Sequence, residues 1–175
     1  MSQRPARLLV VTLLALGLAS RVSAQNAASM AVPCSGPEYR QFDFWVGEWD
    51  VTTPDGKAAG RNSVTRPLGA CVIQEHWKGA GGMNGESYNI YDRATKRWHQ
   101  TWVSDRGALL ELDGGLVDGN MVLSGPEHMV QGKPSRDRIT WTPKSADEVH
   151  QVWEVSSDQG VTWTVQFHGV YKRRK

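Results

Sequence analysis

Three polar residues recur among tryptophans at alternate positions of short, otherwise apolar segments: Glu75, Gln100 and Gln151. A carboxyl group among indole rings can act as a general acid or base, because desolvation raises its pKa toward neutrality. The two amides can orient a polar ligand. A buried polar group without a partner costs about 1–3 kcal/mol. The three residues therefore either complete a structural hydrogen-bond network or face a ligand or water in a cavity.

The tryptophans and these polar residues share one face of each segment, because the side chains of a β-strand alternate between its two faces. Residues 86–91 are ambiguous, since both Tyr88 and Tyr91 are plausible inner residues. Four histidines fall on the opposite face: His76, His99, His150 and His168. A histidine metal cluster inside the fold is therefore not expected. The predicted inner face consists of Cys71, Ile73, Glu75, Trp77, Trp98, Gln100, Trp102, Ile139, Trp141, Val149, Gln151, Trp153, Val155, Val161, Trp163, Val165, Phe167, Gly169 and Tyr171.

Turn signals such as Pro54-Asp55-Gly56 and Asp118-Gly119-Asn120 recur about every ten residues. Short stretches rich in valine, threonine, tryptophan and tyrosine lie between them. This spacing predicts an all-β fold, an antiparallel meander β-barrel of about ten strands. A short helix over about residues 36–46, with Ser35 as N-cap and Pro37 in the first turn, is predicted to plug one end.

The first 24 residues have the pattern of a secretory signal peptide. Arg4 and Arg7 form a basic start, residues 8–19 are apolar, and residues 22–24 supply the small side chains of a cleavage site. Cleavage after Ala24 would leave an exported chain, periplasmic or secreted, without a membrane span; an uncleaved anchor is the alternative. We expect a signal peptide, a flexible leader and a single barrel domain at residues 1–24, 25–36 and 37–175.

Charge and cysteine content agree with an exported protein. Removing residues 1–24 takes away three arginines and no acidic residue, which leaves 17 basic against 18 acidic residues. This balance does not indicate a nucleic-acid-binding surface. Cys34 and Cys71 are the two cysteines of the chain, and an oxidising compartment would join them. Such a disulfide would close a loop of roughly 36 residues and stabilise the fold by about 3–4 kcal/mol.

Two short motifs have local explanations. "SSDQGVTW", residues 156–163, matches the Asp-box pattern of sialidase hairpins, in which Asp158 accepts main-chain hydrogen bonds and Gly160 takes a positive φ. A single copy predicts a turn between the last two strands and not a glycosidase. "GAGGMNG", residues 79–85, predicts a hairpin loop and not a phosphate site. His128 falls in a loop where exposure to solvent is expected, and no metal site is predicted.

The stretch "FDFWVGEWDV", residues 42–51, places aromatic rings ahead of Gly47-Glu48-Trp49. A Gly-x-Trp at a first strand resembles the lipocalin signature, in which the tryptophan closes the barrel floor. Together with "GESYNIYD" (85–92), "WHQTWVSDRG" (98–107) and the Asp-box motif, it makes residues 38–172 similar to an uncharacterised bacterial family. That family has an F-D-F-W-x-G-x-W start and a lipocalin-like (calycin) barrel. The resemblance implies a fold but no activity.

More distantly, the chain is similar to nitrobindins, calycin barrels that hold haem through a histidine near the C-terminus. His168 occupies such a place here, but its surroundings, "QFHGVYKRR", depart from the nitrobindin pattern, and the alternation points it outward. We therefore expect no cofactor. Haem stays as an alternative if a β-bulge reverses the face of this strand.

The leading hypothesis is an exported protein that binds a small, partly apolar or aromatic molecule in the barrel interior. A first alternative is a cofactor-independent isomerase, cyclase or lyase that uses Glu75 as acid or base. A second is a solid barrel that the eight tryptophans fill. The predicted ligand-binding residues are Glu75, Trp77, Trp98, Gln100, Trp102, Trp141, Gln151 and Trp153.

Overall fold

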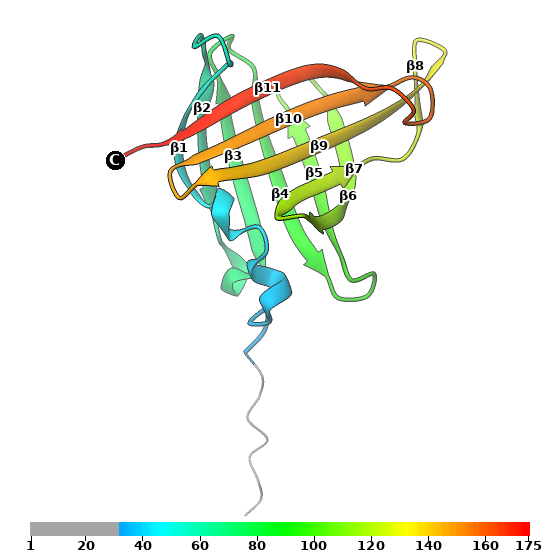
Figure 1. Ribbon diagram of the computed structural model, residues 1–175. Coiled ribbons are helices and arrows are strands. Elements are labelled where there is room, and N and C mark those ends of the chain that lie inside the picture. Colours follow the sequence, from blue (N-terminus) through cyan, green and yellow to red (C-terminus); the bar gives the residue numbers. More distant parts are fainter. Residues whose placement is uncertain (1–31) are drawn as a thin grey trace, which may run out of the picture. The chain divides into compact units, whose positions relative to one another are not determined.

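The computed structural model describes residues 32–175 (Figure 1). The predicted signal peptide and residues 25–31 of the predicted leader lie outside the described residues. None of the helices within residues 32–175 is long and apolar enough to cross a membrane.

The described chain forms one antiparallel sheet that closes on itself into a barrel. Each strand pairs with the next along the chain from β1 to β7, then β7 pairs with β9, and β11 pairs with both β10 and β1 (Figure 1). Ten strands complete the ring, while β8 pairs with β9 as a short extension. The predicted antiparallel ten-stranded meander barrel is confirmed. The strands are β1 (Gly47–Thr52), β2 (Ala58–Thr65), β3 (Val72–Gly79), β4 (Asn84–Asp92), β5 (Arg97–Ser104), β6 (Leu109–Val117), β7 (Asn120–Ser124), β8 (His128–Val130), β9 (Lys133–Ser145), β10 (Glu148–Ser156) and β11 (Thr164–Arg173).

The plug at one end of the barrel is not the single helix that was predicted. Two 3₁₀ helices, η1 (Pro37–Arg40) and η2 (Asp43–Trp45), take its place, and η1 begins after Gly36 without a side-chain cap. Three residues per turn bring side chains three apart onto the same side. The rings of Phe42 and Trp45 accordingly stack with centroids 5.0 Å apart, and both residues are fully buried.

Trp49 closes the barrel floor above this plug. Its indole Nε1 donates a hydrogen bond of 2.9 Å to the carbonyl of Trp45. The guanidinium of Arg173, at the end of β11, lies 4.3 Å from the ring centroid and donates to the carbonyl of Val46 at 2.9 Å. Gly47 is required beside it, because its φ is 148° and a β-carbon there would collide with the Arg173 guanidinium.

A disulfide and two arginines tie the plug to the barrel wall. Cys34 and Cys71 are joined, as predicted, across a separation of 37 residues. Arg40 donates to the carbonyl of Cys34 at 2.9 Å. Arg66, which follows β2, donates to Asp43 of η2 at 2.8 Å. A third 3₁₀ helix, η3 (Leu68–Ala70), connects β2 to the disulfide.

A β-bulge interrupts β11 near the end opposite the plug. Phe167 pairs with Trp153, but the next pair along β10 is Glu154 with Val165, so that Gln166 is the extra residue. A bulge of one residue exchanges the two faces of the strand beyond it.

The prediction that Val161, Trp163 and Val165 face inward is wrong. Val161 and Trp163 lie in the turn before β11, which begins at Thr164, and the bulge turns Val165 outward. Val161 is 80% exposed and Val165 is 55% exposed. Trp163 lies outside the barrel, where the Arg138 guanidinium is 3.9 Å from its ring centroid. The predicted turn before it is present: Asp158 accepts hydrogen bonds from the main chain and side chain of Thr162 at 2.8 and 2.6 Å.

Candidate functional site

The barrel encloses a cavity of about 610 Å³. This volume lies within the usual range of small-molecule sites. The cavity opens at the end that carries β8, because the exposed side chains of Met83, Leu109 and Val130 line it there. The interior is therefore hollow, which contradicts the alternative of a solid barrel. Six of the eight predicted ligand-binding residues line the cavity: Glu75, Trp77, Gln100, Trp102, Gln151 and Trp153.

The other two, Trp98 and Trp141, lie below the cavity in the floor. Both pack edge-on against Phe42 of the plug, with ring centroids 5.7 and 5.1 Å away. Trp98 also donates its indole N–H to the side chain of Gln41 at 3.1 Å. Both tryptophans face inward as predicted, but alternation reports the face of a strand and not the height along the barrel axis.

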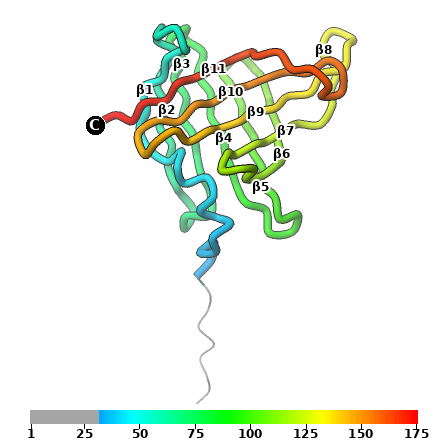
Figure 2. Tube along the Cα trace, in the orientation of Figure 1, coloured from blue at the N-terminus to red at the C-terminus, as the bar shows by residue number. Residues whose placement is uncertain are grey.

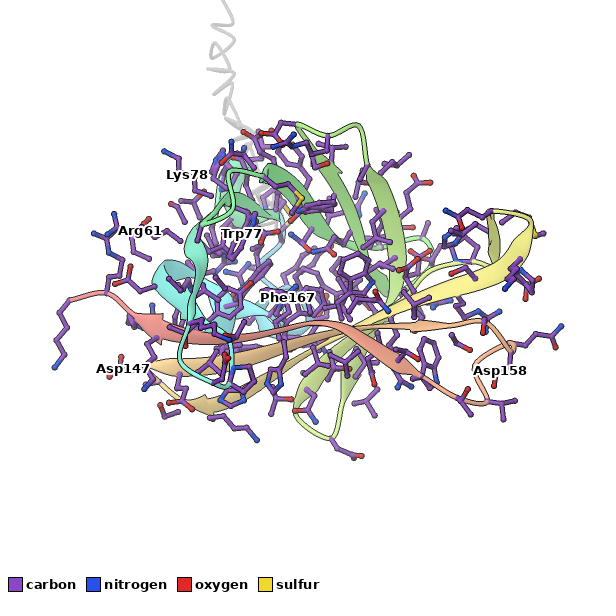
Figure 3. All side chains as sticks on the ribbon, turned by 90° about the horizontal axis from the view of Figure 1, so that it is seen from above. Arg61, Trp77, Lys78, Asp147, Asp158 and Phe167 are labelled. Carbon is purple, nitrogen blue, oxygen red and sulfur yellow. A yellow bond between two sulfur atoms is a disulfide. The ribbon has the colours of Figure 1, made fainter. Side chains whose placement is uncertain are left out.

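Two of the large rings that line the cavity lie close against glycines of neighbouring strands. A β-carbon on Gly60 would come within 2.7 Å of the Trp77 ring, and one on Gly85 within 2.6 Å of the Trp102 ring. Each glycine thus leaves room for an indole that would otherwise project into the lumen. The rings of Trp77 and Phe167 meet edge to face at 5.9 Å (Figure 3).

Glu75 anchors a chain of hydrogen bonds along the wall. It accepts from the side-chain amide of Asn62 and the hydroxyl of Ser87, each at 2.8 Å. The side-chain amide of Asn89 donates to the Ser87 hydroxyl at 3.0 Å. The side-chain amide of Gln100 donates in turn to the side-chain oxygen of Asn89 at 2.8 Å. Glu75 and Gln100 therefore belong to one network, although they do not touch each other. Gln151 lies outside it and accepts a hydrogen bond from the Tyr171 hydroxyl.

Three members of this network, Asn62, Ser87 and Asn89, are absent from the residues predicted from the sequence. Ser87 and Asn89 face inward from β4, whereas Tyr88 is half exposed on the outer face. Tyr91 packs partly buried against the floor, with its ring 6.3 Å from that of Trp98. Over residues 87–90 of β4 the polar side chains are inside and the large apolar or aromatic ones outside, so the usual pattern of hydrophobic alternation is reversed there.

The side-chain oxygen of Gln100 has no hydrogen-bond partner within the described chain. Its orientation follows from the network. The amide nitrogen of Asn89 must face the main-chain carbonyl of Ile73, to which it donates at 3.1 Å. The carbonyl oxygen of Asn89 is thereby turned to the Gln100 nitrogen, which leaves the Gln100 oxygen unpaired. This acceptor belongs to a residue that lines the cavity and is 1% exposed.

Burial raises the pKa of Glu75 to about 7, against the opposing effect of the hydrogen bonds from Ser87 and Asn62. Burial, and then the negative charge of Glu75, raise the pKa of Tyr171 well above its usual value. Glu75 is therefore able to exchange a proton near neutral pH, while the Tyr171 phenol stays protonated.

A second carboxylate, Asp137, lies near the cavity mouth and was also missed. It accepts a hydrogen bond from the Trp153 indole at 2.7 Å, and the imidazole Nε2 of His128 lies 3.5 Å from its other oxygen. Asp137 shares the parity of Ile139 and Trp141, so continuing the alternation by one step would have found it. His128 is 46% exposed, yet it lines the cavity from the β8 extension.

The four histidines on the predicted outer face do not line the cavity. His168 lies 3.4 Å from His150 on the outside of β10 and β11, between Nε2 of the former and Nδ1 of the latter. The bulge falls beyond His168 and does not reverse it. The residues present therefore do not fit a haem held by His168. Within residues 32–175, no three histidine, cysteine, aspartate or glutamate side chains are grouped as metal ligands would be.

No protein-family model matches the chain, and no curated protein sequence matches it. The barrel, its cavity and the residues that line it are therefore the features from which a function can be inferred.

Proposed function

We propose that the protein binds a small, partly apolar or aromatic molecule in the barrel interior, as lipocalin-like proteins with such barrels do. The observation that carries this proposal is the cavity of about 610 Å³ beneath an open mouth. Closed barrels of this size can hold one small ligand. Tight packing would be the more stable arrangement of so many aromatic residues, so a maintained cavity favours a role for the space itself.

The wall supplies both kinds of contact that a ligand site needs. Trp77, Trp102 and Trp153 offer ring surface for stacking, and Gln100 and Glu75 offer polar atoms at fixed positions. The disulfide supports a place for the protein outside the cytoplasm, in the periplasm or the medium, because disulfides persist in oxidising compartments.

The proposal is tested with a neutral fluorescent probe, N-phenyl-1-naphthylamine, which brightens in apolar cavities. Ala108 lines the cavity and is exposed, so Ala108→Trp would obstruct the mouth without disturbing the core. We expect this variant to lower probe affinity at least about tenfold. Ala94→Trp, in the exposed β4–β5 turn, is the matched control and should leave affinity unchanged. Absence of probe binding to the unaltered protein, or equal affinity in both variants, would refute the proposal.

Acid–base catalysis in the same cavity is a second candidate, because the pKa of Glu75 is raised to about 7 in an aromatic enclosure. Isomerisation, cyclisation or decarboxylation would require no further group on the protein. Glu75→Gln would then abolish turnover of any compound found to react, while probe binding persists. Turnover that survives this substitution would eliminate Glu75 as the catalytic acid or base.

A further inference from the structure

The cavity lining is unbalanced in charge. It includes two carboxylates, Glu75 and Asp137, and among the described residues that form it there is no lysine or arginine. His128 is the single basic side chain, and it lies at the mouth, half exposed. Both carboxylates are nearly fully buried, at 5% and 4% exposure. Their closest partners in the interior are neutral donors: Asn62 and Ser87 for Glu75, and the Trp153 indole for Asp137.

A buried polar atom without a partner, on the cavity-lining residue Gln100, is also an acceptor. The side-chain oxygen of Gln100 has no donor within the described chain. The main-chain carbonyl of Ile73 in β3 fixes the orientation of the Asn89 amide, and Asn89 in turn fixes that of the Gln100 amide. A buried acceptor without a partner is unfavourable, so a ligand that supplies an N–H would gain from pairing with it. A ligand with only acceptor atoms would leave it unpaired.

The aromatic wall favours positive charge as well. The faces of indole and phenol rings carry the negative part of their quadrupole, and tryptophan attracts cations most strongly among the aromatic residues. Trp77 and Trp102 each lie against a glycine of the neighbouring strand and line the cavity, so their rings border the open space.

We propose that the ligand is a protonated primary or secondary amine that carries an aromatic or apolar group. This inference rests on the proposed binding function and specifies its ligand class. The ammonium group would be held by Glu75 or Asp137 and would donate to the Gln100 oxygen. The apolar part would lie against the indoles.

The test compares three probes with the same ring system: tryptamine, the neutral alcohol tryptophol and the anion indole-3-propionate. Their dissociation constants are measured by isothermal titration calorimetry at pH 8, where tryptamine is protonated. We expect tryptamine to bind roughly tenfold more tightly than tryptophol, and indole-3-propionate to bind most weakly. Glu75→Gln and Asp137→Asn should each weaken the binding of tryptamine severalfold and change the affinity for tryptophol little. Glu111→Gln, on the exposed outer face of β6, is the matched control and should leave all three constants unchanged.

Each outcome separates the ligand class from the binding function. Equal or tighter binding of tryptophol or indole-3-propionate would overturn the amine assignment and leave the binding function intact. If N-phenyl-1-naphthylamine binds but tryptamine does not, the amine assignment is likewise overturned and the binding function stays intact. If neither the probe nor any of the three indoles binds, the binding function fails and the amine assignment fails with it.

Discussion

The indole of Trp102 lies against the α-carbon of Gly85 on the neighbouring strand, so closely that a β-carbon there would come within 2.6 Å of the ring. Gly60 of β2 and Trp77 of β3 repeat this relationship two strands earlier. The open space inside the barrel is thus maintained by residues that have no side chain. The width of the cavity depends on these glycines as much as on the residues that face it.

Gly85→Ala should therefore push the Trp102 ring into the lumen. We expect weaker binding of N-phenyl-1-naphthylamine and a loss of about 1–3 kcal/mol in the free energy of unfolding, as for other overpacked sites. Urea denaturation and probe titration measure the two effects. Gly115→Ala is the control, because a β-carbon on Gly115 in β6 meets nothing within 4 Å. Equal effects of the two substitutions would show that the Gly85–Trp102 contact does not set the cavity width.

The buried carboxyl group of Glu75 should make the stability of the protein depend on pH. Its pKa is about 7 in the folded state and 4.5 in the unfolded reference, so between these values the folded state binds more protons. The free energy of unfolding should accordingly fall as pH rises from about 4.5 to about 7, by up to about 3 kcal/mol, and then level off.

Urea denaturation of the unaltered protein and of Glu75→Gln at pH 5 and pH 8 checks this expectation. The variant should lose most of the difference between the two pH values, because the amide does not titrate. Glu111→Gln, at an exposed position of β6, is the control and should retain the full difference in unfolding free energy between pH 5 and pH 8. If the unaltered protein and Glu75→Gln respond to pH alike, Glu75 does not titrate in this range.

Arg173 should stabilise the floor through Trp49. Arg173→Met would remove the cation–π contact and the hydrogen bond to the Val46 carbonyl, at a cost of about 1–2 kcal/mol in the free energy of unfolding. Thermal or urea denaturation measures the loss. Lys172→Met, one residue earlier and exposed, should change stability by less than about 0.5 kcal/mol. A loss no larger than that of the control would show that the contact does not contribute.

Breaking the disulfide between Cys34 and Cys71 should release the plug. Loop-closure entropy predicts a loss of about 3–4 kcal/mol for a separation of 37 residues. The double substitution of both cysteines by alanine should match the chemically reduced protein in urea denaturation, because both remove the same constraint. An unchanged unfolding midpoint in both would show that the plug is held without the disulfide.

Sequence alternation predicted the barrel and the inner faces of β3, β5, β9 and β10, because each of these strands keeps a strict period of two. It placed Glu75, Gln100 and Gln151 inside, where they are. It left the face of β4 open between Tyr88 and Tyr91, because the inner face of this strand is polar around Ser87 and Asn89, which complete the Glu75 network.

The remaining differences come from information that alternation does not contain. The bulge at Gln166 follows from pairing with β10 and has no local signature, so the prediction places Val165 on the wrong face. Trp163 is misplaced because the turn extends to it and β11 begins only at Thr164. The separation of the floor tryptophans Trp98 and Trp141 from those of the cavity depends on where the plug enters. Asp137 is absent from the predicted inner face because that prediction for β9 begins at Ile139, one alternation step later.

The pairing of β1 with β11 places the first strand of the barrel beside the last (Figure 2). Arg173 reaches the carbonyl of Val46 across 127 residues of chain. During synthesis, the edge of β1 therefore stays open until the C-terminal strand has emerged, and contacts so distant in sequence form slowly. An open strand edge invites pairing with other chains. Folding of this barrel should hence be a late, nearly all-or-none event, in which the last dozen residues both seal the sheet and lock the floor.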